Sequence, residues 1–315
     1  MVDRHVAEAR RIHRDRPVID GHNDLPWAIR TRASGSLEIA DPSGNLDGYH
    51  TDIPRMLAGG VGAQFWSVYV PASSEHPLRD TLEQIDLVQR MVRANPGLLT
   101  RADTAADIRN IRADGRIACM IGVEGGHSIE GSLGALRMLH DLGAGYMTLT
   151  HNDTTDWADA AGDQPRWGGL NKFGREVVLE MNRIGMIVDI SHVAATTMHA
   201  ALEVTQAPLI ASHSSAYAVA PHPRNVPDDV LERIRDNGGV VMINFYPGFV
   251  VPELVERSQA MLAASRTLAE SLGNRVAVES ALLEQFRASL EGGEHAPKEK
   301  SWFEGVKSFF DDLTS

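Results

Sequence analysis

The stretch Ile117-Ala-Cys-Met-Ile-Gly-Val123 has the length of a β-strand and is apolar on both of its faces. A strand with one face in water alternates apolar and polar residues, whereas a strand of a parallel sheet is covered on both sides and reads as a continuous apolar run. This stretch therefore predicts an interior strand of an α/β protein, covered by helices or by the inside of a barrel.

Six further runs of strand length lie on either side of this one, and segments with helical periodicity separate them. These additional strands are expected at residues 18–20, 61–70, 146–150, 186–190, 208–212 and 240–245. The clearest helical patterns lie at residues 81–94, 133–142, 171–184 and 228–236. Strands that alternate with helices indicate a parallel sheet, and seven such units favour a TIM-type (β/α)₈ barrel over an open, doubly wound sheet.

Residues that bind metals or titrate follow five of the seven runs, at the end where each strand is expected to finish. In a barrel the carboxyl ends of all strands surround one site, whereas an open sheet concentrates its site near one switch point. The distribution therefore favours the barrel and predicts one common site. Its candidate residues are His22 with Asp24, Glu124, His151, His192 and His213.

The residue types in this set suit a divalent metal such as zinc. His22 and Asp24 are two residues apart, so in a strand they point to the same face and offer one nitrogen and one oxygen ligand. Glu124 ends a buried strand between glycines, where a carboxylate is costly unless it is paired or binds a metal; a capping or salt-bridged glutamate is the alternative. A single histidine at a strand end is more often a hydrogen-bonded core residue, but His192 and His213 occur in successive units. Together these residues predict a binuclear metal centre.

Short motifs occur in a fixed order along residues 15–250 and carry a resemblance to a known family. They are Ile19-Asp-Gly-His-Asn-Asp-Leu-Pro26, Gly122-Val-Glu-Gly-Gly126, Leu149-Thr-His-Asn152, Trp157-Ala-Asp159, Val188-Asp-Ile-Ser-His192, Ser212-His-Ser214 and Pro223-Arg-Asn225. In this order they resemble the membrane (renal) dipeptidase family of zinc peptidases, within the amidohydrolase-like metal-dependent barrels. The resemblance implies two zinc ions per chain: His22 and Asp24 bind one, His192 and His213 bind the other, and Glu124 bridges both.

The resemblance also implies an activity and the residues that serve it. It implies a zinc-dependent dipeptidase that hydrolyses short peptides, including those with a D-residue in second position, through a water molecule that bridges the metals. His151 and Glu124 are then the catalytic residues, with His151 on the scissile carbonyl oxygen, and Arg224 pairs with the C-terminal carboxylate of the substrate. Asp20 and Asp189 lie within three residues of ligands and are candidates for orienting a metal-bound imidazole.

The C-terminal part departs from the family pattern. The family's barrel closes with an eighth strand that ends in an aspartate, which holds the substrate's amino group and shuttles protons, and no segment after residue 250 matches it. Residues 252–272, 276–290 and 301–313 have helical spacing instead. We therefore expect residues 1–250 to form a (β/α)₈ barrel that lacks or replaces its eighth strand, and residues 251–315 to form a helical extension packed on it.

Two interpretations of this departure stay open. In one, the chain is truncated and its barrel is open at one edge; in the other, the terminal helices cap that edge in a catalytically impaired protein that binds metal or a partner. Self-association as a homodimer, or coverage by Trp302, Phe303, Phe309 and Phe310, would protect an exposed edge. A third possibility is hydrolysis of another amide or a lactam on the same site.

The composition of the chain indicates which classes of partner and which cellular compartment to expect. A formal net charge of -12 without a basic stripe argues against nucleic acid as a partner. No apolar run approaches the length of a membrane span, and residues 1–16 lack the apolar core of a secretory signal. Cys119 is the one cysteine, which excludes an intrachain disulfide. We expect a cytoplasmic protein with a dipeptide substrate and with neither a nucleic-acid nor a membrane partner.

Overall fold

The computed structural model describes residues 2–260 and 263. The chain divides into two compact units, Met1–Pro252 and Glu253–Ser315. In the second unit, residues 255–260 and 263 are helical, as the sequence predicts. The rest of the predicted helical extension lies outside the described residues, and so do its four aromatic residues and most of the chain after residue 250, where the family's last aspartate was expected. The packing of the extension on the barrel stays a prediction.

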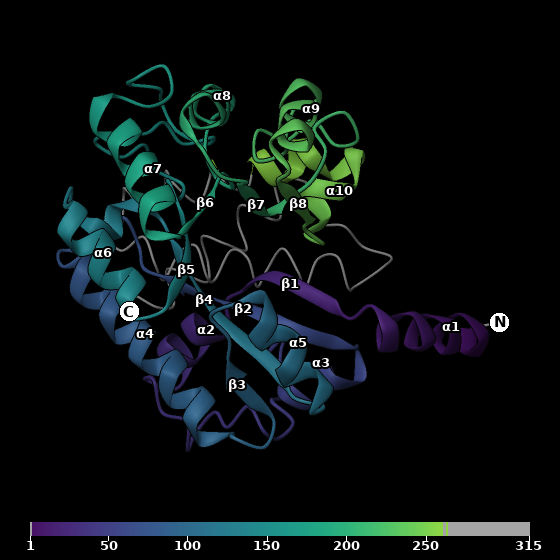
Figure 1. Cartoon of the computed structure of the whole chain (residues 1–315). Helices are drawn as coiled ribbons and strands as arrows, with labels where there is room; N and C mark the ends of the chain where they lie inside the picture. Colours follow the sequence, from purple (N-terminus) through teal and green to yellow (C-terminus); the bar gives the residue numbers. More distant parts are fainter. Residues whose placement is uncertain (1, 261–262, 264–315) are drawn as a thin grey trace, which may run out of the picture. The chain divides into compact units, whose positions relative to one another are not determined.

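Seven parallel strands of the first unit form a nearly closed barrel with an open seam (Figure 1). Neighbouring strands follow the order β1-β2-β4-β5-β6-β7-β8, and a short strand, β3, pairs with the beginning of β4. All seven predicted strands are present; β3 was not predicted because three residues are too few to give a pattern. The strands are β1 (Val18–Asn23), β2 (Val61–Tyr69), β3 (Leu99–Arg101), β4 (Ile117–Glu124), β5 (Ala144–Thr148), β6 (Ile187–Asp189), β7 (Ile210–Ser214) and β8 (Val240–Ile243).

Helices connect successive strands, and α4, α6, α7, α8 and α9 lie on the outside of the sheet in Figure 1. Their ends carry ordinary caps: Thr104 and Asp107 form a capping box at α5, and Gly185 ends α7 in the left-handed conformation. Among the described helices, none combines the length and the hydropathy of a membrane span. The helices are α1 (Val2–Asp15), α2 (Leu25–Arg32), α3 (Ile53–Ala58), α4 (Pro77–Ala94), α5 (Ala105–Ala113), η1 (Gly126–Ile129), α6 (Leu133–Asp141), α7 (Lys172–Ile184), α8 (Ala195–Val204), α9 (Asp228–Asn237), α10 (Pro247–Val250) and η2 (Pro252–Leu254).

Strand β4 explains why an apolar run ends in a charged residue. All eight of its residues are buried. Cys119, Ile121 and Val123 belong to the core between sheet and helices, whereas Ala118 and Met120 belong to a second cluster with side chains of β2 and β5. Because side chains alternate along a strand, Glu124 has the same parity as Ala118 and Met120 and points into the barrel. The strand thus delivers a carboxylate to the mouth of the barrel.

The seam lies between β1 and β8, which no hydrogen-bonded ladder joins among the described residues. Apolar side chains on both strands are exposed, to 46% at Ile19 and to 58% at Ile243. In a closed barrel both strands would have a neighbour on each side. This arrangement agrees with the expectation of a barrel that lacks a full eighth strand.

Because side chains at the seam are exposed, a charged substitution there should change the stability of the fold only slightly. We expect Ile243→Lys to lower the free energy of unfolding by less than about 0.5 kcal/mol, because the side chain already faces solvent. Urea denaturation of the full chain measures this, with Val123→Lys as a buried control that costs more than about 3 kcal/mol. A loss at Ile243 as large as that at Val123 would mean that the seam is covered.

Candidate metal centre

The predicted site residues meet at the carboxyl ends of the strands. His22 lies near the end of β1, Glu124 is the last residue of β4, and His213 lies in β7. His151 and His192 lie in the turns that follow β5 and β6. Five side chains that are scattered over the sequence are therefore brought to one place, as the barrel predicts.

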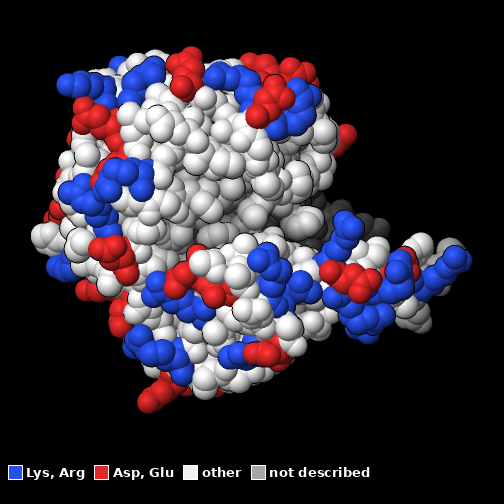
Figure 2. Space-filling view, viewed as in Figure 1, with Lys and Arg blue, Asp and Glu red and all other residues white. Residues whose placement is uncertain are grey.

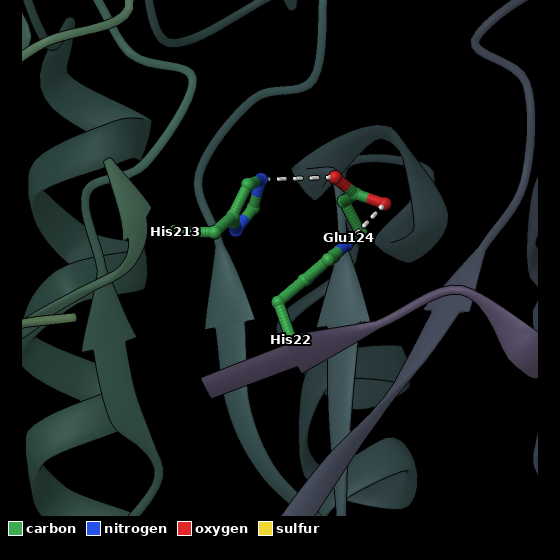
Figure 3. A group of neighbouring side chains, drawn as sticks. All are labelled: His22, Glu124 and His213. Carbon is green, nitrogen blue, oxygen red and sulfur yellow. Dashed lines mark ion pairs between the residues drawn. The ribbon is translucent and has the colours of Figure 1, made fainter. Parts of the chain in front are cut away.

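Glu124 is the centre of this cluster. Its Oε1 atom lies 3.0 Å from Nε2 of His192, 3.4 Å from Nε2 of His213 and 3.7 Å from Nε2 of His151. Its Oε2 atom lies 3.5 Å from Nε2 of His22. Figure 3 shows His22 and His213 directed at the two carboxylate oxygens from different strands. One carboxylate thus faces four imidazoles.

The ligand atoms form two groups that share Glu124. His22, Glu124 and His213 make one group, and Glu124, His151 and His192 make the other; within each group the ligand atoms lie within 4.8 Å of one another. Two such groups around one carboxylate suit two metal ions with a bridging ligand. The geometry thus pairs His22 with His213 and places His151 among the possible ligands, which differs from the pairing that the family resemblance implies.

Asp24 lies at the rim of the cluster. Its Oδ1 atom is 3.2 Å from Nε2 of His22, and its side chain is 59% exposed. Asp20, the other carboxylate of β1, accepts a hydrogen bond from the backbone N–H of His22 and not from its ring. Asp24 thus lies on the solvent side of His22, while Asp20 shapes the backbone of β1.

Close approach of β1 to β7 depends on Gly21. A Cβ atom at this position would overlap Sδ of Met242 and the carbonyl oxygen of Ser212. With glycine there, the ring of His22 stacks on that of His213 with centroids 3.8 Å apart. The seam is therefore narrow at the end of the strands that carries the site.

Burial sets the protonation of the cluster. It lowers the pKa values of His151, His192 and His213 well below the ordinary value, so these imidazoles are neutral near pH 7. Burial opposes a charge on His22 too, but the carboxylates of Glu124 and Asp24 outweigh it and raise the pKa of His22. Burial also raises the pKa of Glu124. Neutral imidazoles next to a carboxylate form a donor set that fits a divalent cation of borderline softness such as zinc.

Neighbouring hydroxyl groups hold the ligands, and sequence reasoning missed three of them. Ser67 donates to Oε2 of Glu124 (3.1 Å), Tyr146 lies 3.3 Å from Nδ1 of His22, and Ser212 lies 2.8 Å from Nδ1 of His213. A signal for them was present, because Ser67 and Tyr146 are polar side chains within mainly apolar strands and Ser212 directly precedes the predicted ligand His213.

The backbone at His192 is strained. Its φ angle is +67°, in the left-handed region that side chains with a Cβ atom rarely adopt. Such a conformation costs about 1–2 kcal/mol and persists where the surrounding structure over-determines it, often at functional sites. A nearby contact fixes this turn: the carbonyl of His192 accepts a hydrogen bond of 2.7 Å from the N–H of Ala161.

Arg224 carries a buried charge with an unsatisfied donor. The residue is 6% exposed, and its Nη1 atom has no hydrogen-bond partner among the described residues. Its guanidinium lies over the ring of Phe249, 5.3 Å from the centroid. Burial lowers the pKa of Arg224 to about 10, which still leaves it charged at neutral pH. A buried cation without a bonded anion is costly, so an anionic ligand is its natural partner.

Comparisons with known proteins identify the family of the chain. A model of the membrane dipeptidase family, peptidase family M19, matches residues 6–291. A model of the chaperone DnaJ C-terminal region also matches a short stretch, residues 281–312. The curated dipeptidase aclJ of Aspergillus oryzae is 42% identical over 296 residues, which cover 90% of this chain and 68% of that protein.

Solved structures give the same result. A metallopeptidase described as dipeptidase AC, of family M19, is 31% identical with a TM-score of 0.65, over 75% of this chain and 74% of that one. A metallopeptidase of Rhodobacter sphaeroides, solved with a phosphinate mimic of the dipeptide L-Ala-D-Ala, is 27% identical with a TM-score of 0.66, over 75% and 76% of the two chains. The chain spans between 66% and 76% of the length of these and a further similar structure.

Proposed function

The chain belongs to the membrane dipeptidase family, and from that premise we propose that it is a zinc-dependent dipeptidase with two zinc ions per chain. The observation that carries the proposal is the convergence of four buried or half-buried imidazoles on the single carboxylate of Glu124. Bound zinc would supply Lewis acidity, which polarises a carbonyl oxygen and lowers the pKa of water toward neutrality. His22, Asp24, Glu124, His192 and His213 would hold the ions.

His151 would act on the substrate's carbonyl group. Its ring packs between the rings of Tyr69 and His192, with centroids 4.6 and 4.3 Å away. Because burial keeps this imidazole neutral, it can donate one hydrogen bond from a protonated ring nitrogen. A donor of this kind at the developing oxyanion contributes about 2.7–4 kcal/mol in other enzymes. The hydrogen bond from Ser67 holds Glu124 in place beside it.

Arg224 would select substrates that carry a free carboxylate at their C-terminal end. Its planar guanidinium matches a carboxylate with two parallel hydrogen bonds, so a peptide with a free C-terminus is the ligand that satisfies it. A fixed carboxylate site at one end restricts the peptides that reach the metal centre to short ones. The L-Ala-D-Ala mimic bound by the Rhodobacter relative supports a D-residue at the second position of the substrate.

Removal and return of the metal test the proposed function. We expect the chelator-treated chain to be inactive, and two zinc ions per chain to restore hydrolysis of dipeptides, L-Ala-D-Ala among them. Metal analysis and a panel of dipeptides, one N-acyl amide and one lactam measure this. Less than one zinc per chain would overturn the proposal. Bound zinc without any hydrolysis would instead indicate a catalytically impaired metal-binding protein, and cleavage of the amide or lactam alone would indicate a different hydrolase.

We also propose that the protein is cytoplasmic, that it forms a homodimer, and that it has neither a nucleic-acid nor a membrane partner. Figure 2 shows acidic and basic side chains interspersed around a largely uncharged area of the viewed face, which supports the expectation of a partner other than nucleic acid. The buried thiol of Cys119 needs no oxidising compartment, which supports a cytoplasmic location. Exposed apolar side chains at the seam are the surface through which a homodimer would form.

A further inference from the structure

Asp189, the last residue of β6, is a fully buried carboxylate that forms no ion pair with a described residue. Its Oδ1 atom accepts hydrogen bonds from the backbone N–H groups of Ser191 (3.1 Å) and Ser212 (2.9 Å). Its Oδ2 atom accepts from the hydroxyl groups of Thr148 (2.5 Å) and Ser212 (2.7 Å). Four neutral donors thus hold one negative charge inside the barrel wall, next to the metal centre.

The hydroxyl group of Ser212 links the carboxylate of Asp189 to His213, one of the proposed metal ligands. It has one proton, and that proton goes to Asp189, because a carboxylate can only accept. The same oxygen lies 2.8 Å from Nδ1 of His213 and must therefore accept there. Nδ1 of His213 carries a proton as a result, and its Nε2 atom, which faces Glu124, keeps a free lone pair. Outer hydrogen bonds of this kind fix the tautomer of metal-binding histidines.

His192 has the opposite arrangement. Its Nδ1 atom is buried and has no hydrogen-bond partner among the described residues. Its Nε2 atom lies 2.9 Å from Nε2 of His213 and 3.0 Å from Oε1 of Glu124. Because Nε2 of His213 is unprotonated, the proton in this contact belongs to Nε2 of His192. The ligand atom of His192 is therefore blocked until its proton moves, and a proton on Nδ1 would lack an acceptor, which costs about 1–3 kcal/mol.

His22 differs from both of these histidines. The hydroxyl group of Tyr146 donates to the carbonyl of Gly21 (3.0 Å), so its oxygen can accept from Nδ1 of His22. The Nε2 atom of His22 faces the carboxylates of Asp24 (3.2 Å) and Glu124 (3.5 Å), which favour a proton there as well.

We propose that Asp189, acting through Ser212, is a positioning residue that fixes the tautomer of His213. This tautomer does not rest on the proposed function, because it is a property of the metal-free chain.

Nitrogen NMR of the histidine rings in the metal-free full-length chain tests the tautomer. We expect a proton on Nδ1 of His213 and on Nε2 of His192. In Asp189→Asn, the new amide donates to Ser212, whose proton then turns to His213 and moves the histidine proton to Nε2. Thr148→Val removes another donor to Asp189 without touching His213 and should leave the tautomer unchanged. A proton on Nε2 of His213 in the unmodified chain, or an unchanged spectrum in Asp189→Asn, would overturn the role of Asp189.

Zinc titration against a competing chelator tests the effect of this positioning on metal binding. We expect Ser212→Ala to weaken zinc binding by about 10–100-fold, as is usual for outer partners of metal ligands. Thr148→Val should change the affinity by no more than about twofold. An unchanged affinity in Ser212→Ala would contradict the positioning role. A chain that binds no zinc overturns the proposed function, while the NMR spectrum still decides the role of Asp189.

Discussion

Glu124→Gln is expected to abolish dipeptidase activity and to weaken zinc binding in both halves of the centre. The carboxylate is the one group that both sets of ligand atoms share, and it faces Nε2 atoms from four histidines. Loss of an outer partner of a ligand typically costs 10–100-fold in affinity, so loss of a shared ligand should cost more than about 100-fold. We expect kcat/KM to fall by at least about 10³-fold, which corresponds to about 4 kcal/mol.

The substitution preserves volume, so a loss of fold is separable from a loss of function. Circular dichroism and urea denaturation should show a folded chain, because a neutral amide is cheaper to bury than a carboxylate. Glu232→Gln, at an exposed position of α9, is the matched control and should retain full activity and zinc content. A Glu124→Gln variant that keeps two tightly bound zinc ions would contradict the bridging role.

Much of the fold was predictable because burial and strand period leave a strong pattern. The apolar run at residues 117–123 predicted an interior strand, and its parity places Glu124 in the barrel. The same argument applies to His22 and His213, which also lie at strand ends, so the position of the site followed from the order of strands. Chain order and strand ends are local properties, and a single sequence records them.

Relations between strands were less predictable, because they depend on how the barrel curves. The stacking of His22 on His213 follows from the close approach of β1 and β7, which Gly21 permits but no spacing indicates. The left-handed backbone conformation of His192 could not be predicted either, because a histidine gives no sign of a positive φ angle. The hydroxyl group of Tyr146 contacts a residue more than a hundred positions away, so only the folded barrel brings the two together.

Arg224→Met is expected to raise KM for dipeptides and to lower kcat/KM by at least about 100-fold, with a smaller change in kcat. The guanidinium would form two charge-assisted hydrogen bonds with the C-terminal carboxylate, worth about 1.5–3 kcal/mol each against water. Binding that is equal in the ground state and the transition state appears in KM. Arg224→Lys should recover little of the loss, because an ammonium group cannot form the paired contact.

Two comparisons separate this role from a structural one. A dipeptide whose C-terminus is an amide lacks the partner of Arg224, so the unmodified chain and Arg224→Met should hydrolyse it at similar, low rates. Arg109→Met, at an exposed position of α5, is the control for arginine removal and should leave both substrates unaffected. The variant should also be at least as stable as the unmodified chain, because it removes a buried charge whose Nη1 atom has no partner. If Arg224→Met instead lost the same factor on the acid and on the amide, Arg224 would be supporting the barrel and the substrate's carboxylate would bind elsewhere.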